Sequence, residues 1–269
     1  MNQTGIALAM NHFAVQLPRV CAVLTLLLGG FGANSALAED YRIGLCFGGC
    51  PQGAADGDEL ILRPIYAMAY NTDTKSADWV AYKVSAGSIG IASNLSREPV
   101  PDNFIADTLD SSDFRELEGT GLVRSQYVPM VNFAGTPYWQ DVNYATNVVA
   151  RSSALNQGAW YGLEWAIRNL VNKTDLVYVV TGPVFRPVAE TPQLHTDKAH
   201  RVPDAFFKVI VTEDGQSAAF LLEQNAAVYV HHCDLRTSIA EIEALTGLTL
   251  FPEADVASFL PLDTSLGCF

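Results

Sequence analysis

The chain has few basic residues. Of its 269 residues, 16 are Lys or Arg and 29 are Asp or Glu, which gives a formal net charge of −13. Proteins that bind the phosphate backbone of nucleic acids usually carry a broad basic surface. The composition therefore excludes a protein that is basic over its whole surface, and it restricts any phosphate-binding site to a local patch on an acidic body.

The first 38 residues contain no acidic residue and one basic residue, Arg19. An apolar run, VCAVLTLLLGGFGA, precedes Ala36-Leu37-Ala38, which fits the small-x-small pattern of a signal-peptidase site. The run is short and broken by glycine, which disfavours a membrane span, although an uncleaved anchor is the alternative. We therefore predict a bacterial signal peptide at 1–38 and a mature protein that is secreted or periplasmic, without membrane attachment.

Residues 39–269 contain neither an internal repeat nor a low-complexity linker, so we expect one domain with a substantial core. Apolar, β-branched and aromatic runs predict strands within 60–71, 78–85, 176–185, 205–212 and 218–224. Apolar residues at helical spacing predict helices over 152–172 and 237–247, the second ending at Gly247. Residues 94–120 are polar and irregular, as in a surface loop. Strands and helices do not alternate regularly, which favours the α+β class.

Four cysteines remain once Cys21 is removed with the signal peptide: Cys46, Cys50, Cys233 and Cys268. An even number in an oxidising compartment suggests disulfides, with three connectivities open. The spacing CFGGC suits a small local loop, which would leave Cys233 to pair with Cys268. A zinc site is the weaker alternative, because no Cys or His completes a second ligand pair at zinc-like spacing.

Several blocks occur in an order that resembles the sugar-nonspecific DNA/RNA endonucleases of the Serratia-nuclease type. They are RSQYVPMVNFAG, LNQGAWYGLEWAIR, VTGPVF, VPDAFFKVIV and IAEIEALTGLTLFP, and the resemblance spans about residues 60 to 252. It implies a ββα-metal fold, with a central antiparallel sheet flanked by helices. It also implies a divalent metal, Mg²⁺ or Mn²⁺, and DNA and RNA as substrates. Some relatives are dimers, so a homodimer is an open alternative. Secreted members share the cysteine layout.

The resemblance assigns roles to individual residues. Asn156 matches the metal-ligand asparagine, and an amide oxygen suits Mg²⁺; alternatively, Asn156 is an ordinary residue near a helix N-terminus. Glu164 and Arg168 match positions that organise metal-bound waters and the phosphate. They are spaced i, i+4 and could equally form a surface ion pair. Asn147 matches a further active-site asparagine.

The block around residue 124 departs from the family, which usually reads Asp-Arg-Gly-His there. This chain has Val123, Arg124, Ser125 and Gln126. Arg124 remains as a phosphate clamp, but Gln126 stands in place of the histidine that accepts a proton from the attacking water. An amide cannot accept that proton, and loss of a general base costs on the order of 10²–10⁴ in rate.

A second catalytic arginine of the family aligns near Asp102, and Arg97 is the nearest arginine. The four mature histidines, His195, His200, His231 and His232, lie outside the motif and are not expected to replace the base. The sequence therefore predicts a secreted metal-dependent endonuclease with weakened catalysis. The alternative is an inactive pseudo-nuclease that binds nucleic acid or protein.

Overall fold

The computed structural model describes residues 42–187 and 192–269. The predicted signal peptide lies outside the described residues, and residues Tyr41–Phe269 form one compact unit. The start of the mature domain at residue 39 stays a prediction. Within the described ranges, no helix is both long enough and apolar enough to cross a membrane.

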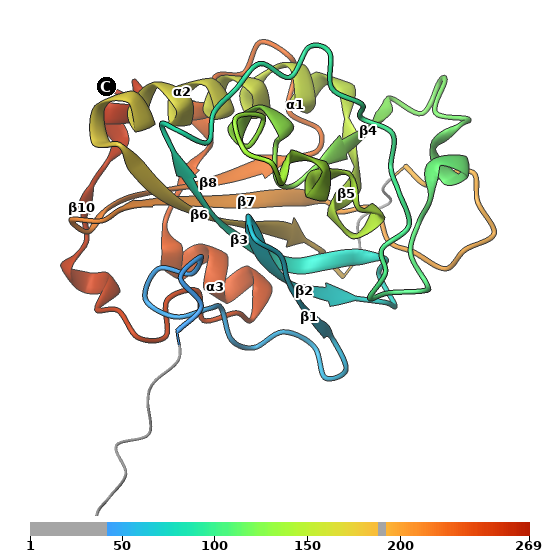
Figure 1. Ribbon diagram of the computed structural model, residues 1–269, viewed down its shortest axis with the longest axis horizontal. Helices are drawn as coiled ribbons and strands as arrows, with labels where there is room; N and C mark the ends of the chain where they lie inside the picture. Colours follow the sequence, from blue (N-terminus) through green and yellow to red (C-terminus); the bar gives the residue numbers. More distant parts are fainter. Residues whose placement is uncertain (1–41, 188–191) are drawn as a thin grey trace, which may run out of the picture. The chain divides into compact units, whose positions relative to one another are not determined.

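A large, mostly antiparallel sheet forms the centre of the molecule (Figure 1). Its strands follow the order β1-β2-β3-β6-β7-β8-β10, with β9 paired to β8. Only the β10–β8 pair is parallel among the described strands. The strand bounds are β1 Glu59–Leu62, β2 Tyr66–Asn71, β3 Ser76–Ser85, β6 Leu176–Val184, β7 Ala205–Thr212, β8 Gln216–Glu223, β9 Arg236–Thr237 and β10 Leu260–Pro261.

Helices cover both faces of this sheet, which explains why the central strands are apolar on both sides. Helix α2 (Ala159–Thr174) lies over one face, and α3 (Ile239–Thr246) lies over the other (Figure 1). Successive residues of β7 point to opposite faces, so Phe206 joins the core beneath α2 and Phe207 the core beneath α3. The predicted α+β class, with an antiparallel sheet flanked by helices, is confirmed.

Two elements differ from the sequence-based prediction. The single strand expected within 60–71 is two strands, β1 and β2, paired as a hairpin around Pro64; proline lacks the N–H that a ladder requires. The helix expected over 152–172 is divided at Gly158 into α1 (Ser153–Gln157) and α2. At Gly158 the backbone passes so close to Val228 that a Cβ would overlap the Val228 carbonyl oxygen. The division gives α1 and α2 separate directions.

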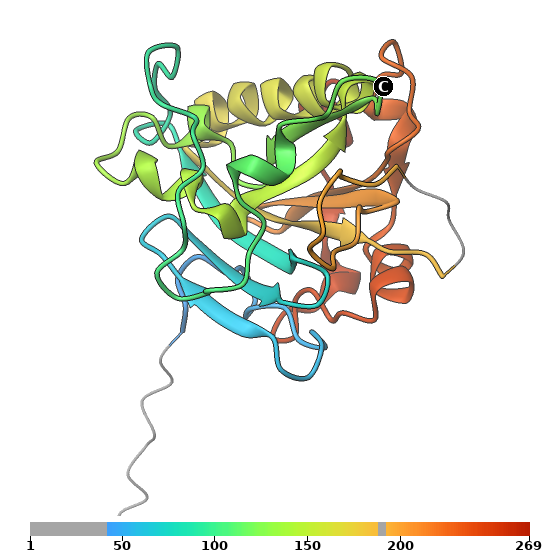
Figure 2. The same cartoon turned by 90° about the vertical axis from the view of Figure 1, so that its right-hand side faces the viewer.

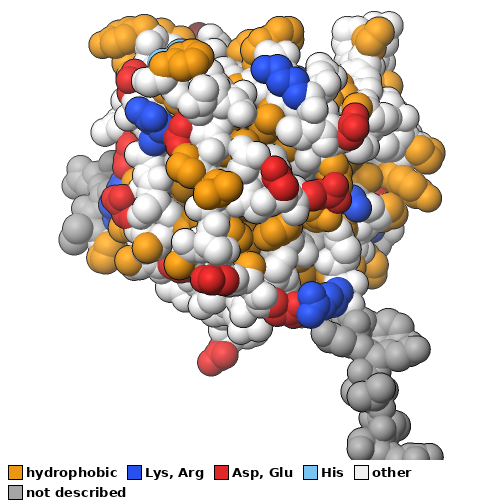
Figure 3. Space-filling view, turned by 90° about the vertical axis from the view of Figure 1, so that its left-hand side faces the viewer, with side chains coloured by type: hydrophobic (Ala, Val, Ile, Leu, Met, Phe, Trp, Pro, Cys, Tyr) orange, Lys and Arg blue, Asp and Glu red, His pale blue; other side chains and the backbone are white. Residues whose placement is uncertain are grey.

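The surface is not broadly basic. On the face drawn in Figure 3, acidic, basic and apolar side chains are interspersed. This agrees with the excess of acidic residues in the composition.

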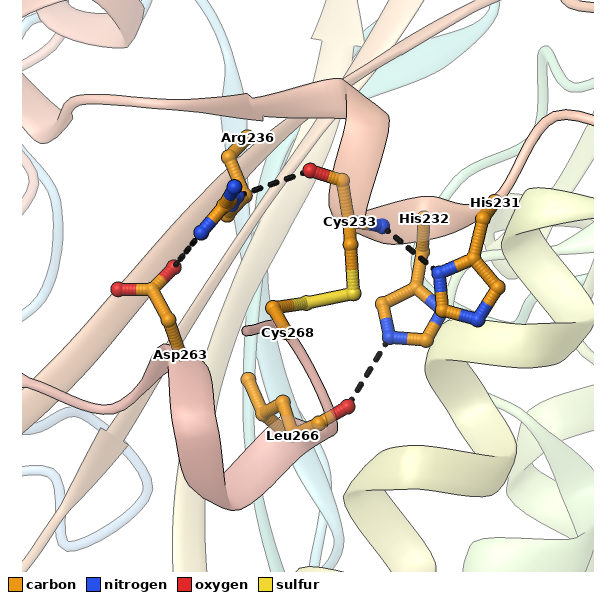
Figure 4. The surroundings of a disulfide bond; sticks show 7 residues. All are labelled: His231, His232, Cys233, Arg236, Asp263, Leu266 and Cys268. Atoms are coloured by element: carbon orange, nitrogen blue, oxygen red, sulfur yellow. Dashed lines mark hydrogen bonds and ion pairs between the residues drawn. A yellow bond between two sulfur atoms is a disulfide. The ribbon is translucent and has the colours of Figure 1, made fainter.

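Both predicted disulfides are present. Cys46 pairs with Cys50, four residues away, and Cys233 pairs with Cys268, 35 residues away. Figure 4 shows that the second bridge fastens the C-terminal segment beside His232, whose Nε2 lies 3.1 Å from the carbonyl oxygen of Leu266. The bridge thus reinforces a segment that also packs into the core through Leu262 and Leu266.

Removal of the long-range disulfide should destabilise the protein more than removal of the short one. For a Cys233→Ser/Cys268→Ser variant, loop-closure entropy predicts a loss of about 4 kcal/mol, against about 2 kcal/mol for Cys46→Ser/Cys50→Ser. Urea unfolding of the two variants beside the unmodified protein measures the difference. Equal losses would show that loop length does not control the stabilisation.

Candidate functional site

Two strands outside the large sheet and the two helices that follow them build the site. Strand β4 (Leu122–Gln126) pairs antiparallel with β5 (Val148–Ser152). Ser152 then caps α1, because its Oγ accepts a hydrogen bond from the Leu155 N–H at 3.1 Å. Figures 1 and 2 both show β4, β5, α1 and α2 on one side of the large sheet. The order strand, strand, helix is that of the predicted ββα motif.

A cleft of about 400 Å³ opens where these elements meet. Strand β4 supplies three consecutive residues to its wall, 124–126, and α1 supplies Asn156. Helix α2 supplies Trp160, Glu164 and Arg168, which are spaced four residues apart on one face of the helix. The polar and aromatic residues that line the cleft are Arg97, Arg124, Ser125, Gln126, Asn156, Trp160, Tyr161, Glu164 and Arg168. The cleft thus brings together Arg124, Gln126, Asn156, Glu164 and Arg168, which the sequence had predicted as site residues.

The cleft is locally basic although the protein is acidic. Three arginines line it, Arg97, Arg124 and Arg168, against one carboxylate, Glu164. Arg124 contacts Glu98 at 3.4 Å, but this pair is exposed to solvent, and exposed ion pairs contribute little stability. Its guanidinium can therefore exchange Glu98 for another anion at small cost.

The loop before β4 brings Arg97, the arginine nearest to Asp102, to the cleft. Arg97 lines the cleft, whereas Asp102 is buried elsewhere. The Asp102 carboxylate pairs with Arg63 at 2.6 Å and accepts a hydrogen bond from Thr146 Oγ1 at 2.6 Å. Asp102 is therefore not among the lining residues of the cleft, and the loop contributes an arginine to it.

Gln126 sits at the end of β4, held by hydrogen bonds to the segment before β5. Its Nε2 donates to the carbonyl oxygen of Val142 at 2.8 Å and to Asn143 Oδ1 at 3.2 Å. These bonds orient the amide within the cleft wall. A carboxamide in this position can orient a water molecule but cannot take its proton.

Asn156 is surrounded by hydrogen-bond donors. Its Oδ1 accepts from Ser125 Oγ at 2.8 Å and from Arg151 Nη1 at 3.0 Å. Arg151 Nη1 also donates to Ser125 Oγ. The three side chains form a closed triangle beside the cleft, and the amide oxygen faces a guanidinium.

Arg151 is fully buried in β5. Its guanidinium carbon lies 3.4 Å from the centre of the Trp160 ring, and its Nη2 donates to the Gln126 carbonyl oxygen at 3.1 Å. Burial lowers the pKa of Arg151 from 12.5 to about 9. The side chain therefore remains cationic at neutral pH.

Glu164 is the centre of a second buried network. Its carboxylate accepts a hydrogen bond from Lys208 Nζ, a second from Asn132 Nδ2 at 3.2 Å, and lies 3.9 Å from Arg168 Nη1. Lys208, from β7, is fully buried, and burial lowers its pKa from 10.5 to about 8. The predicted pairing of Glu164 with Arg168 is present, but Lys208 is the closer partner.

Asn147 lies behind the cleft rather than on its wall. Its side chain is buried, accepts from the Val128 N–H at 2.9 Å, and donates to the carbonyl oxygens of Val142 and Val128. These bonds hold the turn after β4 against the segment that leads to β5. A role of Asn147 in orienting a metal or a phosphate stays a prediction.

The histidines lie away from the cleft, since none of them is among its lining residues. His231, His232 and Cys233 form the one close group of metal-ligating side chains in the described parts of the chain. Cys233 is in a disulfide (Figure 4). Its sulfur is therefore not a thiolate ligand, which agrees with the preference for disulfides over a zinc site.

Sequence reasoning missed Arg151, Lys208 and Ser125. A lone lysine within the apolar run AFFKVIV was a usable signal, because a buried lysine requires an acidic partner. Arg151 precedes a predicted helix and resembled an ordinary surface residue. Nothing in the local sequence indicates its burial.

Comparisons with known proteins agree with this geometry. Residues 51–257 match the family model described as DNA/RNA non-specific endonuclease. A nuclease of Serratia marcescens is 33% identical over 82% of this chain and 85% of its own length. Nuclease C1 of Cunninghamella echinulata var. echinulata is 24% identical over 78% of this chain and 89% of its own length. A crystal structure of the EndoG/EndoGI complex shares the fold, with a TM-score of 0.65 and 19% identity over 75% of this chain and 89% of that one. The chain belongs to the DNA/RNA non-specific endonuclease family.

Proposed function

We propose that the chain binds DNA and RNA, either single-stranded or double-stranded, in its arginine-lined cleft and hydrolyses their phosphodiester bonds slowly. The observation that carries this proposal is the convergence of Arg97, Arg124 and Arg168 on one cleft of an acidic protein. Its relatives are named nucleases, which supports a phosphodiester hydrolase.

The arginines supply what phosphoryl chemistry needs from the protein. Guanidinium groups match phosphate oxygens in geometry and remain charged at all relevant pH values. They would hold the phosphodiester and stabilise the charge that develops on its oxygens as water attacks phosphorus. The binding is electrostatic and does not read base sequence, as expected of a non-specific nuclease.

Weak hydrolysis follows from Gln126. Its amide is hydrogen-bonded to Val142 and Asn143, and it cannot accept the proton of the attacking water. Proton removal by a positioned base contributes about 10²–10⁴-fold, so the rate should be lower by that order than in an enzyme with such a base. Binding without turnover, the pseudo-nuclease alternative, is the limiting case.

Family membership suggests a divalent metal, but the contacts of this chain fit one poorly. Both lone pairs of Asn156 Oδ1 are engaged by Ser125 and Arg151. The one carboxylate of the cleft, Glu164, is bonded to Lys208. Magnesium usually needs one or two available carboxylates. The proposal therefore includes no step that passes through a metal.

We also propose that the mature protein acts outside the cytoplasm. The leader-like pattern of residues 1–38 and the two disulfides support this. Disulfides persist in oxidising compartments and are rare in the cytosol.

Oligonucleotide binding at increasing salt tests the cleft. Replacing Arg124 with glutamine should weaken binding of a labelled oligonucleotide and reduce the slope of log K against log salt by about 1, because one phosphate contact is lost. The matched control is Arg115→Gln, which removes an exposed arginine outside the cleft and should leave both quantities unchanged.

Plasmid and RNA cleavage by the unmodified protein tests the chemistry. Slow cleavage that Arg124→Gln reduces supports the proposal. Binding without any cleavage on prolonged incubation would establish the pseudo-nuclease alternative. Absence of binding to both DNA and RNA would overturn the proposal.

A further inference from the structure

We infer that the buried guanidinium of Arg151 stands in place of the divalent metal, so that Asn156 serves as a hydrogen-bond donor to phosphate instead of a metal ligand. This inference rests on the proposed function and assigns the chemistry of the same cleft. It predicts that the protein binds phosphodiesters without any divalent cation.

The hydrogen bonds of the Asn156 side chain determine how its amide is oriented. A carboxamide oxygen accepts two hydrogen bonds, and both positions are filled by Arg151 Nη1 and Ser125 Oγ. Arg151 determines which end of the amide faces it, because an N–H₂ group there would oppose the guanidinium, which cannot accept a hydrogen bond. The Nδ2 of Asn156 makes no hydrogen bond to any described residue, so it is the polar atom left for a ligand in the cleft.

Arg151 has no hydrogen-bonded counter-ion among the described residues, although Glu164 lies near enough to attract it. The Arg151 side chain is fully buried, yet no ion pair within residues 42–187 and 192–269 includes it. Its bonds are to neutral groups: Ser125, Asn156 and the Gln126 carbonyl. A buried charge without a bonded counter-ion is costly to fold. An anion in the adjacent cleft would compensate this charge, and a phosphodiester is such an anion.

The side chains around this part of the cleft are mostly cationic. Arg151 and Lys208 both lie against Trp160, at 3.4 Å and 3.8 Å from its ring centre, and Trp160 lines the cleft. With Arg124 and Arg168 on the wall, a divalent cation beside Asn156 would meet four cationic side chains and one carboxylate that Lys208 already neutralises. The same arrangement favours an anion, and burial strengthens the attraction.

Metal binding is measured directly on the unmodified full chain. Titration with Mn²⁺, followed by electron paramagnetic resonance, should show no stoichiometric site. Fluorescence anisotropy with a short labelled oligonucleotide should give affinities in EDTA and in Mg²⁺ that agree within about twofold, beyond the general screening by Mg²⁺ that any polyanion experiences.

Substitution of Asn156 by aspartate separates the two roles. A carboxylate would strengthen a metal site. By our inference, Asn156→Asp removes the donor, pairs with Arg151 and repels phosphate. Oligonucleotide affinity should then fall at least about tenfold, in EDTA and in Mg²⁺ alike, as for loss of a charge-assisted hydrogen bond. Gln157→Glu adds an equal charge one residue away, at an exposed position outside the cleft, and should change affinity little.

The outcomes are distinguishable. Stoichiometric Mn²⁺ binding that Asn156→Ala abolishes, or oligonucleotide binding that requires a divalent cation, would overturn this inference and leave the proposed function standing. No oligonucleotide binding under any condition would overturn the proposed function as well. The comparison of oligonucleotide binding in EDTA and in Mg²⁺ uses the unmodified protein, so that test does not depend on the folding of a variant.

Discussion

Replacing Gln126 with histidine is expected to raise the rate of plasmid cleavage by about 10²-fold, the lower end of what a positioned base contributes. Gln126 lines the cleft and donates to the Val142 carbonyl oxygen at 2.8 Å. An imidazole could donate its Nδ1–H to the same carbonyl, which would leave Nε2 as the proton acceptor for water. The arginines that would hold the phosphate are already present.

The pH profile distinguishes a restored base from a change in binding. Activity of Gln126→His should rise with pH as imidazole loses its proton near its usual pKa of about 6.5, and the unmodified protein should lack this rise. The measurement is the initial rate of supercoiled-plasmid nicking across pH. Gln157→His, an exposed substitution outside the cleft, is the matched control.

An unchanged rate in Gln126→His would show that more than the proton acceptor is missing. If oligonucleotide affinity also stayed unchanged, the protein would be a binding module with a nuclease fold. If Gln157→His raised the cleavage rate as much as Gln126→His, the position of the base at the end of β4 would be wrong.

Replacing Lys208 with methionine is expected to destabilise the protein by about 3 kcal/mol, because it leaves the Glu164 carboxylate buried without its closest cation. Lys208 is fully buried and bonded to Glu164, which is 3% exposed. Arg168 and Asn132 remain near Glu164 at 3.9 Å and 3.2 Å. Because they still stabilise the carboxylate, we expect a loss of stability at the lower end of the range for a broken buried ion pair.

A double substitution tests this coupling. Glu164→Gln/Lys208→Met removes both charges and should recover about 2 kcal/mol of the loss, since neutralised pairs often cost little. Urea unfolding at neutral pH measures all variants. Lys173→Met, which replaces an exposed lysine of α2, should stay within about 0.5 kcal/mol of the unmodified protein. Additive losses for Glu164 and Lys208 would contradict the coupling.

Periodicity in the sequence was sufficient to predict the main elements. The apolar stripe that predicted a helix consists of Leu155, Ala159, Leu163, Ala166, Ile167 and Leu170, and all six are buried on the inner side of α1 and α2. This succeeds because a 3.6-residue period in apolar residues is a local property that burial on one face requires. The division at Gly158 was not predictable, because it depends on the Val228 carbonyl, 70 residues further along the chain.

The candidate site was predictable only where its residues belong to contiguous blocks. Arg124 and Gln126 share one strand, and Asn156, Glu164 and Arg168 lie in one contiguous block of sequence, so the family resemblance located them together. The second arginine of the family could not be assigned to a residue from the sequence, because the loop before β4 has no regular pattern to align. The cleft lining shows that Arg97, and not Asp102, reaches the site.

Composition, periodicity and motif order thus predicted the fold class, the disulfides and the family, because each depends on local pattern or on residue count. The tertiary structure decided which groups surround Asn156. Ser125 from β4 and Arg151 from β5 both bond to the Asn156 amide oxygen. Lys208 from β7 lies beside Trp160, which lines the same cleft, and Ser125 and Lys208 come from segments far from Asn156 in the chain. Their effect on the site is electrostatic and requires their burial at short distance, and neither burial nor distance is encoded in the neighbouring residues.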